Sequence, residues 1–229
     1  MKKRIVRTAT LSVTVLFAAA SISLAQGPDT TPTSSSAAGS TSVSNPATTS
    51  AQPTDAEMMK QMTEMAKLNE NHKLIASTAG TWTYNVTMWM APGAPPTKST
   101  GTAVRKAMMD GRYFSLEVAG KMTMPGADGK MKDMQFKGMG IEGYDNVKKK
   151  FIGSWIDNMG TGIMMSEGTY DPATKTFTYT SDEEMMPGMK TKIRELVKII
   201  DPNHHTMEWY EDRGTGEAKT MEINYTRKK

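Results

Sequence analysis

The chain contains no cysteine among its 229 residues. Disulfide bonds, thiol nucleophiles and zinc sites built on thiolates are therefore excluded. Histidine is also scarce, with only His72, His204 and His205. The last two are adjacent in a predicted turn, so we expect them to be solvated rather than to chelate an ion together. Neither G-x-S-x-G nor H-E-x-x-H occurs, which excludes the common esterase and zincin signatures.

Long apolar runs are missing as well, and none is long enough for a stable membrane-spanning helix. The short run at 11–20 follows four basic residues and precedes Ser23-Leu24-Ala25. This order is typical of a secretory signal peptide that is cleaved before Gln26. We therefore predict a signal peptide at 1–25 and a soluble, exported protein in the periplasm or outside the cell.

A strong charge of one sign is lacking once this peptide is set aside. The whole chain has a formal net charge of +4, and residues 1–25 carry four basic side chains and no acidic one. The remaining chain is therefore neutral, and its composition predicts no nucleic-acid partner.

Large apolar side chains are rare in residues 26–53, which are rich in Ser, Thr, Ala and Pro. Such a segment cannot bury enough surface to offset its chain entropy, so we predict a disordered tether. We predict an N-terminal amphipathic helix at residues 54–78. Thr54 and Glu57 form a capping-box pattern there, and Met58, Met62 and Met65 share one face.

From residue 79 onwards the pattern has period two. Trp82, Tyr84 and Val86 alternate with polar residues, and Asp110-Gly111 is a strong hairpin signal. We predict one all-β domain at 79–229, an antiparallel barrel of about ten strands, because closure removes exposed strand edges. The expected strands begin near residue 80 and then lie at about 99–109, 112–122, 133–144, 150–157, 162–170, 175–183, 190–200, 206–212 and 218–228.

Two segments resemble the bacterial DUF1579 family. They are residues 143–171, GYDNVKKKFIGSWIDNMGTGIMMSEGTYD, and residues 79–114, AGTWTYNVTMWMAPGAPPTKSTGTAVRKAMMDGRYF. The similarity extends over roughly 69–227. It implies a lipocalin-like β-barrel, and it implies neither an established activity nor known site residues.

A Gly-x-Trp at the start of the first strand is similar to the calycin signature. In that signature the Trp plugs one barrel end and an Arg of the last strand packs across it. Trp82 matches the first position, and Arg227 falls on the apolar face of the last strand. The resemblance therefore implies that Trp82 and Arg227 close the barrel, and a cation over an indole ring is favourable.

The string from Gly138 to Gly143 matches G-x-G-x-x-G, but a turn and another strand follow it instead of a helix. A dinucleotide site needs that helix. We expect the glycines to allow bends or close packing, and we predict no cofactor.

We predict a non-enzymatic protein that binds a small apolar or amphipathic ligand inside the barrel. The candidate binding residues are Trp89, Arg105, Trp155 and Asp157. The alternative for Asp157 is a purely structural role in the turn that follows it.

Two other functions stay open. The 22 methionines suit Cu(I) binding or oxidant scavenging, although methionine is also a common filler of apolar cores. An enzyme would need two carboxylates in one pocket with pKa values pushed apart. The sequence specifies no oligomeric state.

Overall fold

The computed structural model describes residues 52–229, except 92–93, 127 and 129. The predicted signal peptide and almost all of the predicted tether lie outside these residues. Within the described part of the chain, no helix combines the length and the apolar content needed to cross a membrane.

The segment predicted as one helix forms two, α1 (Asp55–Met65) and α2 (Glu70–Ser77). The predicted capping box of Thr54 and Glu57 starts α1. Between the two helices, Asn146 Nδ2 donates to the carbonyls of Met65 and Lys67 at 2.7 Å each. The Asn69 side chain then caps α2 by accepting from the amide of Asn71 at 3.0 Å.

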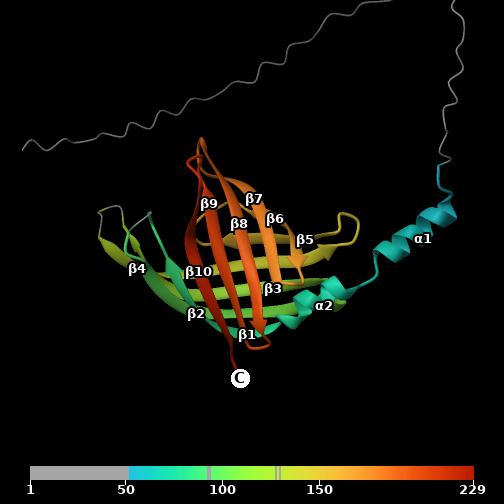
Figure 1. The fold of residues 1–229 in the computed structure, drawn as a ribbon, viewed down its shortest axis with the longest axis horizontal. Helices are drawn as coiled ribbons and strands as arrows, with labels where there is room; N and C mark the ends of the chain where they lie inside the picture. Colours follow the sequence, from blue (N-terminus) through green and yellow to red (C-terminus); the bar gives the residue numbers. More distant parts are fainter. Residues whose placement is uncertain (1–51, 92–93, 127, 129) are drawn as a thin grey trace, which may run out of the picture. The chain divides into compact units, whose positions relative to one another are not determined.

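Ten antiparallel strands form a closed barrel, as the sequence predicted. Each strand pairs with its neighbour in the sequence, and β1 pairs with β10 to close the ring (Figure 1). The predicted hairpin at Asp110-Gly111 is present as a short 3-10 turn with positive φ at both residues. The strands are β1 (Gly80–Met88), β2 (Thr97–Met108), β3 (Tyr113–Pro125), β4 (Met131–Asp145), β5 (Lys150–Asp157), β6 (Met164–Asp171), β7 (Thr176–Met186), β8 (Met189–Asp201), β9 (His204–Asp212) and β10 (Glu217–Arg227).

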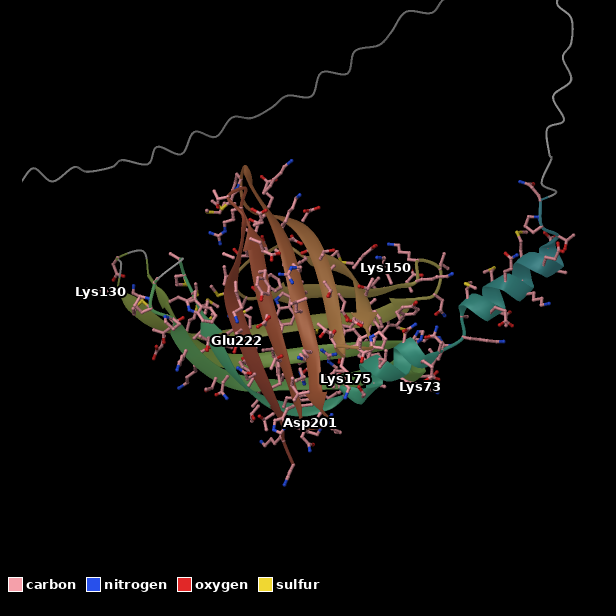
Figure 2. All side chains as sticks on the ribbon, in the orientation of Figure 1. Lys73, Lys130, Lys150, Lys175, Asp201 and Glu222 are labelled. Atoms are coloured by element: carbon pink, nitrogen blue, oxygen red, sulfur yellow. The ribbon has the colours of Figure 1, made fainter. Side chains whose placement is uncertain are left out.

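The barrel has a closed end, where β1 begins and β10 ends. Ile75 of α2 is buried there against Phe114, Phe151 and Phe177 from three different strands. At the other end, which we call the open end, the β3–β4 hairpin projects (Figure 1). Figure 2 shows Asp201 and Lys175 at the closed end, and Lys130 at the tip of that hairpin, far from both. The helix α2 packs on the closed end of the barrel.

The glycines of the G-x-G-x-x-G string make room for an indole ring. A Cβ at Gly138 would overlap the Trp155 side chain, and a Cβ at Gly140 would lie 2.7 Å from the carbonyl oxygen of Ser154. Both glycines point into the lumen opposite β5. The string thus serves close packing within a barrel strand, as predicted, and leads into another strand instead of a helix.

Candidate functional site

At the closed end the guanidinium group of Arg227 packs over the indole ring of Trp82. The Arg227 guanidinium carbon lies 4.2 Å from the centroid of the Trp82 ring, which is 3% exposed. The same guanidinium donates to the carbonyls of Ala79, Ser77 and Pro202 at 2.6, 3.0 and 2.7 Å. This is the arrangement that the calycin-like signature implies.

Inside that plug lies an ion pair between β2 and β4. Arg105 Nη1 is 2.6 Å from Glu142 Oε2, and Arg105 Nη2 donates to Glu142 Oε1 at 2.9 Å. Arg105 Nη1 also donates to the hydroxyl of Thr78, the C-terminal cap of α2, at 2.8 Å. Only 12% of the Arg105 side chain and 20% of the Glu142 side chain remain exposed, so the pair is largely withdrawn from solvent.

Glu195 adds a second carboxyl group at this level of the lumen. It lies on the interior face of β8, directly opposite Tyr179 of β7. The pKa of Glu195 is raised to about 7, chiefly by burial and also by the Glu142 carboxylate, with Arg105 acting in the opposite direction. No described residue forms a hydrogen bond or ion pair with its carboxyl group. By its exposed area Glu195 is nevertheless only partly buried, and its cross-strand neighbour on β9 is Trp209.

Two tyrosines and a histidine surround these charges. Burial raises the pKa of Tyr179 and of Tyr225, and Glu195 and Glu142 contribute to both shifts. His205 stacks on Tyr225 with ring centroids 4.4 Å apart. These groups form, with Arg105, what we call the basal cluster: Arg105, Glu142, Tyr179, Glu195, His205 and Tyr225.

The prediction that both residues of the His-His pair are solvated is wrong for His205. The strand β9 begins at His204, so His205 takes an interior position and is 7% exposed. Burial lowers the pKa of His205 to about 3, and Arg105 and Arg227 add to the shift. The imidazole is therefore neutral, and within the part of the chain that the structure describes its Nδ1 has no hydrogen-bond partner. His204 stays exposed beside Asp201.

Closer to the open end, the lumen wall is built from thioethers and aromatic rings. These side chains occupy interior positions and all are partly accessible to water. Several pack against the buried core residues of β1 and β10. We call them the methionine–aromatic set: Met88, Phe136, Trp155, Met164, Trp209 and Met221.

Both indoles of this set are held by a carboxylate two positions further along. Trp155 Nε1 donates to Asp157 Oδ2 at 2.9 Å, and Trp209 Nε1 donates to Glu211 Oε1 at 3.2 Å. The other oxygen of Asp157 accepts from the amide of Met159 at 2.8 Å, so Asp157 also builds the turn after β5. The barrel interior therefore carries charged groups toward the closed end and thioethers and indoles toward the open end, and the two regions meet where Glu195 of β8 lies opposite Trp209 of β9.

The four predicted binding residues do not form one group. Arg105 lies in the basal cluster, whereas Trp155 and Asp157 lie in the half of the barrel nearer the open end. Trp89 follows β1 and lies 5.6 Å below the Nζ of Lys219. Lys219 pairs with Glu208 and Glu222 on the outer surface, so Trp89 lies outside the lumen.

Two further depressions lie at the closed end. A cavity of about 270 Å³ is bordered by Trp82, His205 and the β8–β9 turn. A wider groove of about 720 Å³ runs between α2 and the β4–β5 and β6–β7 turns. Among the described residues, no three His, Asp or Glu side chains are grouped so as to hold a metal ion.

Comparison with known families agrees with this architecture. The family described as "Protein of unknown function (DUF1579)" matches residues 67–227. The chain belongs to the DUF1579 family. The matched range contains every strand of the barrel together with α2. No curated protein matches the sequence of this DUF1579 chain, so its function is inferred from the lumen itself.

Sequence reasoning missed most of the basal cluster of this DUF1579 domain. Glu142 and Glu195 were not singled out, although each occupies an apolar-face position of its strand. An ionisable residue at an interior position is the signal that would have found them. In Glu195 that signal is weak, because Arg194 and Leu196 flank it and the local alternation is irregular.

Proposed function

We propose that the protein is a non-enzymatic binder of a small amphipathic ligand inside the barrel. The observation that carries this proposal is the layered lumen, with hydrogen-bonding groups at a closed base and a partly accessible apolar wall toward the open end. Ligand sites are commonly apolar with a few polar groups that set the orientation. Methionine-rich walls adapt to flexible apolar chains.

The signal-peptide pattern of residues 1–25 adds a setting to this proposal. We propose that the protein meets its ligand after export, in the periplasm or outside the cell. N-terminal sequencing of the protein recovered from the exported fraction tests this point, with Gln26 as the expected first residue.

The binding proposal is tested with Nile red, a neutral dye that fluoresces in apolar surroundings. We expect saturable binding to the purified protein and displacement by decanol. Native mass spectrometry of the exported protein adds a direct observation, since a small-molecule adduct that is lost on denaturation supports the proposal. A copper-sized mass increment would instead support the methionine-based alternative.

Two neighbouring methionines of β6 provide a matched pair of variants. Met164 lies opposite Trp155 on the interior face, whereas Met165 lies opposite Ser154 and is 62% exposed. Met164→Trp should fill the lumen and weaken Nile red binding by about tenfold or more, since lost apolar burial of ~1.4 kcal/mol has this effect. Met165→Trp should leave binding unchanged. Equal binding by both variants would contradict a lumenal site.

One observation favours an enzyme as the second candidate. The barrel interior contains two carboxyl groups in different surroundings, because Glu142 is paired with Arg105 whereas Glu195 is unpaired among the described residues and has its pKa raised to about 7. Such a pair can supply an acid and a base. Turnover of a chromogenic ester by the wild type, lost in Glu195→Gln while Nile red still binds, would favour catalysis over binding alone.

A further inference from the structure

We propose that the ligand is a cationic amphiphile whose ammonium group lies beside Glu195 and whose apolar chain extends along the methionine–aromatic set. This inference rests on the proposed lumenal binding and specifies the chemistry of the ligand.

The first argument is the balance of charge in the basal cluster. It contains one arginine and two carboxyl groups, and His205 is neutral. Arg105 is already engaged by both oxygens of Glu142 and by the Thr78 hydroxyl. A ligand with an anionic head group would have to displace Glu142 from Arg105. A ligand with a cationic head group would instead supply the positive partner that the Glu195 carboxyl group lacks.

The second argument is that the Glu195 carboxyl group has no hydrogen-bond or ion-pair partner among the described residues. Buried polar groups are nearly always hydrogen-bonded, and an unpaired one is costly. The carboxyl group of Glu195 is bonded to no described residue, and its side chain is only partly buried. A primary amine there would donate to it and stabilise its ionised form.

The third argument is the aromatic surrounding of this position. Tyr179 lies directly opposite Glu195 on the neighbouring strand, and Tyr225 is close enough for Glu195 to raise its pKa. Tyrosine rings attract ammonium groups through their negative faces. Toward the open end the interior side chains are mainly methionines and aromatic residues. Such a surface suits the apolar chain of the ligand better than a second charged group.

Binding should depend on pH through Glu195. The charged and titratable groups that face it are Glu142 of β4, Arg105 of β2, Tyr179 of β7 and Tyr225 of β10. On β9 the residue opposite Glu195 is Trp209, which does not titrate, and His205 lies further toward the closed end, opposite Ile199. The pKa values of the tyrosines are raised and that of His205 is lowered to about 3, so these groups do not titrate near neutral pH. Glu195, with a pKa of about 7, is the group that titrates near neutral pH.

The experiment compares decylamine, decanol and decanoate, which share one chain, as competitors of Nile red. At about pH 8 we expect decylamine to bind about tenfold or more tightly than decanol, the effect of one charge-assisted hydrogen bond. The preference should shrink at about pH 5, where Glu195 is protonated. Calorimetry at about pH 7 in buffers of different ionisation enthalpy should show proton release when decylamine binds.

Glu195→Gln should remove the preference for the amine and the proton release while keeping the affinity for decanol. Glu183→Gln is the matched control, because Glu183 has the same interior orientation on β7 but lies near the open end opposite Thr191. It should retain the preference. Tighter binding of decanoate than of decylamine, or an amine preference that survives Glu195→Gln, would overturn the inference. Failure of both decanol and Nile red to bind would instead overturn lumenal binding itself.

Discussion

At the scale of single residues, Glu195 is a carboxyl group whose burial costs free energy when the group ionises. A carboxyl group with a pKa near 4.5 in the unfolded chain has a pKa of about 7 in the folded protein, chiefly because burial disfavours its charge. The unfolded chain therefore releases this proton more readily than the folded one. As a result, the group lowers the free energy of unfolding as the pH rises from about 4.5 through about 7.

Glu195→Gln should consequently stabilise the protein, and more so at about pH 8 than at about pH 5. The expected gain at the higher pH is roughly 2–3 kcal/mol, since each pKa unit corresponds to about 1.4 kcal/mol. Denaturant unfolding at the two pH values measures it. The control is Glu167→Gln, which changes an exposed carboxylate paired with Lys148. A pH dependence that is the same in both variants would refute the assignment.

At the scale of elements, α2 is more than a cover for the barrel end. Its cap residue Thr78 is 4% exposed and links three parts of the chain. The Thr78 hydroxyl donates to Ile75 and accepts from Arg105, and the Thr78 carbonyl accepts from Trp82 Nε1 at 3.0 Å. The helix end thus holds both the plug residue of β1 and the cation of the basal cluster.

Thr78→Val removes the acceptor of Arg105 while keeping the shape of the side chain. We expect a loss of about 1–3 kcal/mol in the free energy of unfolding, because a buried charged donor then lacks one partner. Ser77→Ala is the neighbouring control, since the Ser77 hydroxyl is exposed and bonds only within the helix. Its effect should stay within about 0.5 kcal/mol. Equal losses in urea unfolding would contradict a special role for Thr78.

At the scale of the whole molecule, one seam decides whether the sheet is a barrel. The strands β1 and β10 come from the two ends of the domain and pair from Trp82–Arg227 to Met88–Met221. Every other pairing joins strands that follow one another in the sequence. The β1–β10 pairing is therefore the contact with the greatest cost in loop-closure entropy. Arg227 stabilises this seam at the closed end through its hydrogen bonds to three backbone carbonyls.

Arg227→Met should accordingly loosen the seam before the rest of the barrel. We expect faster hydrogen exchange at the amides of β1 and β10, while the β6–β7 hairpin keeps its protection. Lys228→Met is the control, because Lys228 is the next residue and its side chain is exposed. Uniform acceleration over all strands would show global destabilisation instead of local opening of the seam.

The sequence by itself determined the ten strands, the turns between them and the family. Alternation of apolar and polar residues and turn signals such as Asp110-Gly111 are local, so they can be identified without the fold. It also brought out Arg105, Trp155 and Asp157, which the structure places at interior or rim positions. It missed the break between α1 and α2, where the backbone carbonyls bond to Asn146, a residue about 80 positions away.

Only the tertiary structure decided which interior residues meet. Arg105, Glu142 and Glu195 come from β2, β4 and β8, and closure of the barrel brings their charges into one lumen. The same closure places Trp89 outside and His205 inside, which depends on where each strand begins and ends. The physical reason is that burial and partnership are properties of the closed barrel, whereas the sequence records only the order of residues along each strand.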